Sequence, residues 1–78
     1  MAIGAYILIN GKVGKIKQVV ATLAKVKGVK SVHACWGRPD IFAYVELDDL
    51  RALGELVLDK VQRLDGVEQT DTHIVIGE

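Results

Sequence analysis

The sequence predicts an α+β domain of the ferredoxin-like type, βαββαβ, in which a four-stranded antiparallel sheet carries both helices on one face. Two observations predict this fold. Gly28-Val29 recurs as Gly66-Val67, and Ala5-Tyr6 recurs as Ala43-Tyr44 at the same offset of 38 residues. Each copy has the pattern of a strand, a helix and a strand, so the 78 residues contain one unit repeated twice.

The first half of the chain begins with a buried strand and continues into an amphipathic helix. Residues 5–9 form the strand, and Asn10-Gly11 suits a turn because both residues tolerate positive φ. The helix that follows has a single apolar stripe at helical spacing, which comprises Ile16, Val19, Val20, Leu23 and Ala24. Gly28 stands where that helix ends.

The second half repeats this pattern after a short turn. Residues 29–36 alternate as a second strand, and residues 41–47 form a third. Asp48 or Asp49 then caps a helix. The apolar stripe of that helix comprises Leu50, Leu53, Val57, Val61 and Leu64. Gly66 ends it, and residues 67–76 form the last strand.

The predicted sheet leaves one face without a cover. Both crossovers are right-handed, so both helices pack on the same side of a sheet with the strand order 4-1-3-2. Yet residues 5–9 and 41–45 are apolar on both sides, as expected for strands that are buried on both faces. A second copy is the expected cover, with two sheets back to back about 10 Å apart. The sequence therefore predicts a homodimer of the dimeric α+β barrel type.

Composition and charge exclude several classes of function. Ten basic residues balance ten acidic ones, so no broad positive field exists to hold nucleic acid or an anionic membrane. No unbroken apolar run exceeds five residues, far below the roughly 20 needed to span a bilayer. The single cysteine, Cys35, cannot form an internal disulfide. We expect one domain over residues 1–78, cytoplasmic, without a cofactor, and with no direct nucleic-acid or membrane partner.

Four residues have side chains that commonly bind metal ions, but the predicted strand order keeps them apart. His33, Cys35, Asp71 and His73 are ligand types, and each pair is spaced i, i+2 on one face of a strand. The strand order, however, places the second and fourth strands at opposite edges, roughly 14 Å apart. One ion cannot bridge that distance within a protomer.

Two patterns that suggest catalysis or phosphate binding are also weak. Cys35 with His33 could act as nucleophile and base, but no third residue orients the histidine. The segment 11–15, Gly-Lys-Val-Gly-Lys, lacks the Ser or Thr that must follow the lysine of a phosphate-binding loop, because Ile16 stands there. The sequence predicts no catalytic residues.

One group of residues has the makings of a specific site. It comprises a turn and part of the last strand: Gly37, Arg38, Pro39, Asp40, Thr70, Asp71 and Thr72. Arg38 and Asp40 offer the two charges that an amino acid zwitterion needs, and the two threonines supply hydroxyls. The alternative is a structural turn with threonines that serve strand propensity alone.

Three segments bear a resemblance to a known family. They are residues 37–41, Gly-Arg-Pro-Asp-Ile; residues 48–50, Asp-Asp-Leu; and residues 64–72, Leu-Asp-Gly-Val-Glu-Gln-Thr-Asp-Thr. With Lys27-Gly28-Val29 they resemble, in order and spacing, the effector-binding domain of the Lrp/AsnC family of transcription regulators. Pro39 stands where that family usually has an aromatic residue, and the usual helix-turn-helix is missing. The resemblance therefore implies a stand-alone form of this domain.

The resemblance also implies a function. It implies dimers that associate into tetramers up to decamers, amino acid effectors bound between dimers near residues 37–40 and the threonines, and full-length regulators as further partners. The first hypothesis is thus a non-catalytic amino acid sensor and oligomerisation module linked to transcription regulation. A small dimeric α+β barrel enzyme of the cofactor-free oxygenase or isomerase kind is the alternative, with an assembly module that binds no ligand as the third.

Overall fold

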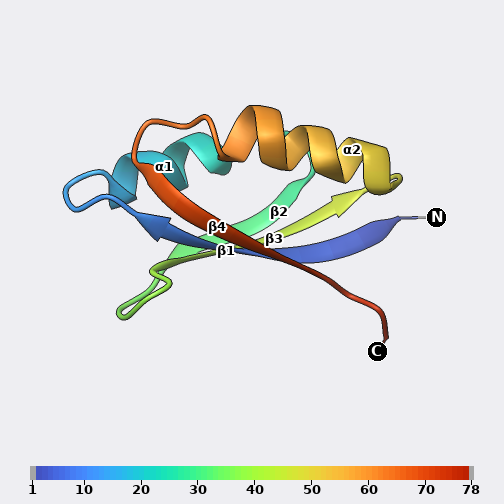
Figure 1. Ribbon diagram of the computed structural model, residues 1–78, viewed down its shortest axis with the longest axis horizontal. Helices are drawn as coiled ribbons and strands as arrows, with labels where there is room; N and C mark the ends of the chain where they lie inside the picture. Colours follow the sequence, from blue (N-terminus) through green and yellow to red (C-terminus); the bar gives the residue numbers. More distant parts are fainter. Residues whose placement is uncertain (1, 78) are drawn as a thin grey trace.

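The computed structural model describes residues 2–77 and has the βαββαβ order (Figure 1). Its elements are β1 (Ile3–Gly11), α1 (Ile16–Leu23), β2 (Val29–Ala34), β3 (Ile41–Leu47), α2 (Leu50–Glu55), a π-helical continuation η1 (Leu56–Val61) and β4 (Val67–Ile74). The strands pair antiparallel in the order β2-β3-β1-β4, which confirms the predicted order. Figure 1 shows both helices on one side of the sheet, as expected. Within residues 2–77, no helix has the length and apolarity needed to cross a membrane.

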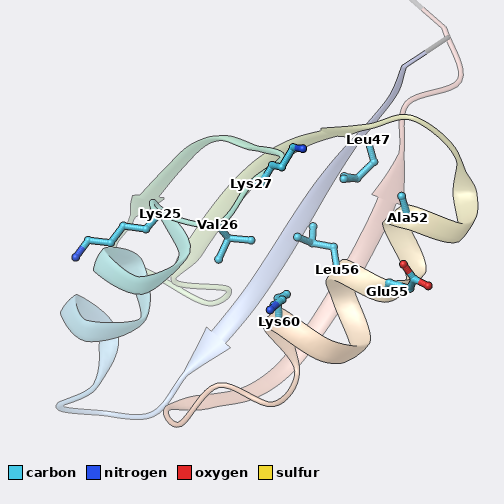
Figure 2. Close-up of a pocket in the computed structure, with 8 residues that line it drawn as sticks. All are labelled: Lys25, Val26, Lys27, Leu47, Ala52, Glu55, Leu56 and Lys60. Carbon is cyan, nitrogen blue, oxygen red and sulfur yellow. The ribbon is translucent and has the colours of Figure 1, made fainter.

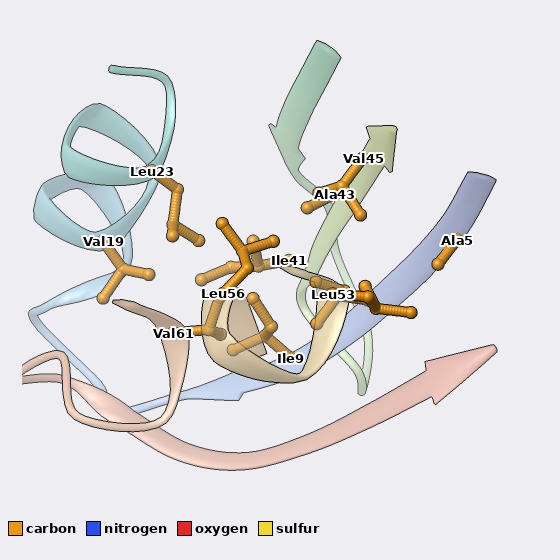
Figure 3. Packing of buried hydrophobic residues seen from close by; sticks show 11 residues of the cluster. Ala5, Ile9, Val19, Leu23, Ile41, Ala43, Val45, Leu53, Leu56 and Val61 are labelled. Atoms are coloured by element: carbon orange, nitrogen blue, oxygen red, sulfur yellow. The ribbon is translucent and has the colours of Figure 1, made fainter. Parts of the chain in front are cut away.

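The core lies between the helices and one face of the sheet (Figure 3). Every second residue of β1 is buried on that face, and so is every second residue of β3. The sheet contributes Ala5, Ile7, Ile9, Ile41, Ala43 and Val45, and the helical layer contributes Val19, Leu23, Leu53, Leu56 and Val61. The intervening residues of β1 and β3, which alternate with the buried ones, face away from the helices. The core therefore occupies one face of the sheet only.

The second helix deviates from the predicted apolar stripe. Leu53 and Val61 are buried as expected, but Leu50 is 60% exposed, so its assignment to the core was wrong. Leu56 is buried in its place. The reason is the π-helical turn, in which the N–H of Gln62 donates to the carbonyl oxygen of Val57 at 2.8 Å. A π turn brings residues five apart onto one side, so both Leu56 and Val61 reach the core.

The limits of several segments also differ from the prediction. Asn10 and Gly11 are the last residues of β1 and not a turn, and the chain turns at residues 12–15. β2 ends at Ala34, and Trp36 is fully exposed in the connection to β3. β4 ends at Ile74 rather than at residue 76.

The prediction that Gly28 and Gly66 end the helices was wrong, because α1 ends at Leu23 and η1 at Val61; the two glycines instead lie where the chain turns into the next strand. Their φ values are +99° and +100°, a conformation that side chains rarely adopt. A Cβ atom on Gly66 would lie 2.7 Å from the Cβ of Lys15 and 2.9 Å from the Cγ2 of Val19. The repeat is therefore explained at both sites by backbone geometry, and at Gly66 also by close packing against α1.

Asp49 is the N-cap of α2, which confirms one of the two caps predicted from the sequence. Its Oδ1 accepts a hydrogen bond of 2.8 Å from the N–H of Ala52. Asp49→Ala is expected to lower the free energy of unfolding by about 1 kcal/mol, because that N–H loses its acceptor. Thermal denaturation followed by circular dichroism should show a melting temperature about 4–8 °C lower. Asp48→Ala is the matched control, and an equal loss there would contradict the assignment of the cap.

Candidate functional site

The predicted turn forms a charged network at the end of the sheet where β1 ends and β3 and β4 begin. The Oδ1 of Asp40 accepts from the N–H of Gly11 at 2.8 Å, and its Oδ2 accepts from Nη1 of Arg38 at 2.8 Å. The same Nη1 donates to the carbonyl oxygen of Gly11 at 3.0 Å, and Nη2 lies 3.4 Å from Oε1 of Glu68. We call Gly11, Arg38, Asp40 and Glu68 the clip, because they connect the β2–β3 turn to β1 and β4.

The clip has a closed side and an open side. The Asp40 side chain is only 13% exposed, whereas those of Arg38 and Glu68 are about half exposed. Gly37 adopts φ +107°, and the Arg38–Pro39 peptide bond is cis. Arg38 and Asp40 therefore neutralise each other at the sheet, while the second amino group of Arg38 faces outward with Glu68.

The predicted residues of β4 are divided between the two faces of the sheet. Thr70 lies opposite Ile9 and Thr72 opposite Ile7, so both threonines lie on the helix side. Asp71 lies opposite Leu8 on the uncovered side, where its Oδ2 is 3.0 Å from Nε2 of His73. The structure thus places both threonines on one face of the sheet and separates Asp71 from them.

Two hollows border the clip. One, of about 470 Å³, is lined by Ile16, Ala34, Cys35, Trp36, Gly37 and Asp40. The other, of about 340 Å³, is lined by Gln62, Val67, Glu68, Gln69 and Thr70. Both include predicted site residues, Gly37 and Asp40 in the first and Thr70 in the second.

Some residues of this region were missed by the sequence reasoning. Nε2 of Gln62, at the end of the second helix, donates to Oγ1 of Thr70 at 3.1 Å. Glu68 supplies the outer carboxylate of the clip. The side-chain oxygen of Asn10 is buried without a hydrogen-bond partner, while its amide donates to Gln69 at 3.3 Å. No local pattern signals these roles, because they depend on how β4 packs against β1, the β2–β3 turn and the end of the second helix.

A second ion pair connects α1 to the loop before β4. Nζ of Lys15 lies 2.6 Å from Oδ2 of Asp65. The hydrogen bond and the charge of Lys15 lower the pKa of the Asp65 carboxyl below its ordinary value. Its stabilising effect is present above the pKa of the unfolded chain and is lost as the pH falls through the lower, folded pKa. The Asp65 side chain is 70% exposed, so the effect is small.

The face of the sheet opposite the helices carries an apolar centre. We call Tyr6, Leu8, Phe42 and Tyr44 the open face; in the strand register Tyr6 lies opposite Tyr44, and Leu8 opposite Phe42. The two tyrosine rings are 4.9 Å apart between centroids, and Tyr6 remains 49% exposed. Desolvation raises the pKa of the Tyr44 hydroxyl, which also donates to Glu46 at 3.2 Å. The phenol therefore stays neutral at physiological pH.

The residues considered for metal binding or catalysis lie on separate edges. His33 is in β2 and His73 is in β4, with β3 and β1 between them. Over residues 2–77, no three His, Cys, Asp or Glu side chains gather into a group that could hold an ion. Cys35 is exposed. Within one protomer, these residues do not form a joint site.

The four-stranded sheet with both helices on one face is a fold that this chain shares with ligand-binding domains of transcription regulators. The chain belongs to the Lrp/AsnC ligand-binding domain family, which matches residues 4–78. The HTH-type transcriptional regulators PH0140 of Pyrococcus horikoshii and PF1231 of Pyrococcus furiosus are 37% and 33% identical over 71 residues, or 91% of this chain. The chain spans 45% and 48% of their lengths. The resemblance inferred from the sequence is confirmed.

Solved structures share the fold over nearly the whole chain. FFRP-DM1 superposes with a TM-score of 0.91 at 28% identity, over 95% of this chain and 99% of its own. AsnC of Escherichia coli gives 0.90 at 26%, over 97% of this chain and 52% of its own. NMB0573 of Neisseria meningitidis, solved in complex with L-Met, gives 0.88 at 24% over 97% of this chain and 51% of its own, a likeness of fold alone.

Proposed function

We propose that this domain binds an amino acid effector at the clip and assembles through its open face, as a non-catalytic module of transcription regulation. The observation that carries the proposal is the clip, a charged network with two hollows beside it at one end of the sheet. Membership of a ligand-binding domain family supports it, as does the L-Met complex of the Neisseria relative.

The geometry of the clip suggests how a zwitterion would be held. Nη1 of Arg38 stays on Asp40, where the contact is short and sheltered. Nη2 makes the longest contact of the clip, 3.4 Å to an exposed Glu68 carboxylate. In this proposal the ligand separates that pair, with its carboxylate on Arg38 and its ammonium on Glu68. Gly37 and Pro39 shape the turn.

The residues of β4 take different parts in this proposal. Thr70 lines the hollow beside Glu68 and offers its hydroxyl to the ligand. Thr72 follows on the same face of the strand, further from the clip. Asp71 lies on the opposite face of the sheet, so only the Asp71 of a neighbouring protomer could reach the ligand. A site completed by a second dimer would use both faces of β4.

The open face is the proposed dimer interface. Tyr6 and Phe42 are 49% and 38% exposed on the uncovered face of the sheet, where large apolar side chains gain free energy from burial. Two such sheets stack about 10 Å apart. Further association of dimers, from tetramers to decamers, and mixed assembly with full-length Lrp/AsnC regulators are parts of the same proposal.

The proposed role is binding rather than catalysis. His33 and His73, the candidate bases of the enzyme alternative, are exposed on opposite edge strands. A general base needs a substrate pocket beside it and a group that orients it. Asp71 can orient His73, but both side chains are exposed and line neither of the two hollows beside the clip, so the arrangement does not favour an oxygenase or isomerase.

The binding site is tested by calorimetric titration with the twenty amino acids. We expect at least one to bind, and Thr70→Val to weaken it about 5- to 10-fold through loss of one hydrogen bond. Arg38→Gln should weaken it more, about 30-fold, because the lost bond is charged. Thr22→Val, an exposed threonine of α1, is the matched control. Absence of binding across the panel would overturn the effector role and leave assembly alone.

A further inference from the structure

A cleft between the end of α1 and the second helix lies away from the clip (Figure 2). Its volume is about 460 Å³, within the range of small-molecule sites. It is lined by Val26, Lys27, Leu47, Ala52, Leu56 and Lys60, with Lys25 and Glu55 at its margins. We propose that this cleft is a second ligand site, which binds a small organic carboxylate with an apolar body.

The floor of the cleft is apolar. Figure 2 shows Val26 and Leu56 projecting into the gap from opposite sides. Leu56 is only 5% exposed and also belongs to the core, so the floor is rigid. Ala52 contributes a single methyl group on the second helix, which leaves room above Leu47. An apolar ligand body of a few carbon atoms would be removed from water here, at about 0.8 kcal/mol for each methylene.

The helix that lines the cleft has an unusual geometry. Leu56 and Lys60 both belong to η1, the π-helical segment. Such segments are rare and recur at functional sites. Here the π turn keeps Leu56 in the floor and Lys60 at the rim, although Val61 must also enter the core. The π turn therefore determines which side chains of η1 line the cleft.

The opposite rim of the cleft is formed by a loop whose backbone is anchored to β3. Gly28 has φ +99° and approaches β3 so closely that a Cβ atom would lie 2.9 Å from Cδ1 of Leu47. Its carbonyl oxygen accepts from the N–H of Glu46 at 2.9 Å. Lys27 immediately precedes this anchored residue. Its backbone is therefore positioned by the sheet and not left to a free loop.

The charge of the rim is positive. In the part of the chain that the structure describes, Lys25, Lys27 and Lys60 form no ion pair, while Glu55 is 3.6 Å from Arg51. Figure 2 shows Lys27 and Lys60 at two ends of the gap and Lys25 pointing away from it. An adjoining hollow shares Lys27 but includes Glu46 and Asp48, which disfavours an anion there. The carboxylate would thus be bound between Lys27 and Lys60.

This site is separate from the proposed effector site. Leu47 is the last residue of β3, whereas the clip precedes the first, so the two lie at opposite ends of that strand. The cleft is also on the helix side and the open face on the other. Dimer formation through the open face would leave it accessible, and loss of one site does not imply loss of the other.

The test is a titration of the whole protein with isocaproate, followed by amide proton–nitrogen NMR. Shifts are expected at residues 25–27 and 52–60, with saturation in the millimolar range or below. The neutral isocaproamide and inorganic phosphate should each bind at least about 10-fold more weakly, since one lacks the charge and the other the apolar body. No saturable shifts up to about 20 mM, or equal binding of the amide, would overturn the proposal.

Variants separate the contributions of charge and cavity. Lys27→Gln and Lys60→Gln should each weaken isocaproate binding about 5- to 10-fold. Ala52→Leu should abolish it without changing any charge, because the added side chain fills the gap; a dispersed spectrum checks that this variant is folded. Lys17→Gln, on the exposed side of α1, is the matched control. A loss of affinity for Lys17→Gln equal to that for Lys60→Gln would overturn a localised site.

Discussion

Replacing Leu8 with aspartate is expected to leave the protein folded but to convert it from dimers to monomers. Leu8 lies beside Phe42 on the open face and is not part of the core between the sheet and the helices, so its replacement leaves that core intact. In the proposed dimer, the twofold axis brings two such carboxylates into an apolar interface. Burying an unpaired charge costs several kcal/mol, so we expect the dissociation constant to rise at least about 100-fold.

Sedimentation velocity over a range of concentrations measures this change, with circular dichroism to verify the fold. Leu58→Asp is the matched control, because Leu58 is 59% exposed on the helical layer. It introduces the same charge and should leave the dimer intact. A Leu8→Asp protein that dimerises as tightly as the wild type would exclude the open face as the interface, and a monomeric wild type at micromolar concentration would exclude the dimer altogether.

Asp40→Ala is expected to be the most destabilising single substitution at the clip. It removes the acceptor of the Gly11 N–H and the sheltered partner of Arg38 together. Leaving the N–H of Gly11 without an acceptor costs about 1–3 kcal/mol, and the lost hydrogen bond to Arg38, which keeps Gly11 and Glu68 as partners, adds about 1 kcal/mol, so we expect a loss of about 2–4 kcal/mol. Since the Asp40 side chain is 13% exposed, solvent screens this loss only slightly.

The measurement is thermal and urea denaturation at one fixed protein concentration. A drop in melting temperature of about 10–20 °C is expected for a chain of this size. Asp40→Asn keeps an acceptor for Gly11 and should lose about half as much. Asp71→Ala, which breaks only the exposed pair with His73, is the control and should change little. A change below about 0.5 kcal/mol for Asp40→Ala would show that the clip does not hold the sheet end together.

Much of the fold follows from local patterns. The repeat and the right-handed crossovers give the strand order and the side that the helices cover. Gly28, Gly66 and Asp49 carry specific backbone or capping roles that their residue types signal directly. The π-helical turn could not be predicted in this way, because Leu53, Leu56, Val57, Val61 and Leu64 fit an α-helical stripe nearly as well. Only the packing of Leu56 into the core decides between them.

The sequence singled out the turn and part of β4 but not how their side chains are arranged. Alternation along β4 shows that Asp71 opposes the threonines, yet the register with β1 is needed to assign each face. The pairing of Arg38 with Asp40 depends on the path of a turn that no periodicity describes. Glu68 meets Arg38 across 30 residues of sequence, because β4 returns beside β1, and Gln62 reaches Thr70 through the path of the loop between the second helix and β4.

In the proposed dimer, the open face would also link the stability of the protein to its abundance. A domain of 78 residues buries a modest core on one side of its sheet, so a dimer through the other side adds binding free energy to that of folding. By mass action, the melting temperature of such a protein rises with its concentration. In a cell, scarce protomers would be the first to unfold or to pair with any related chain that presents a matching sheet. The amount of protein made would then help to select its partner.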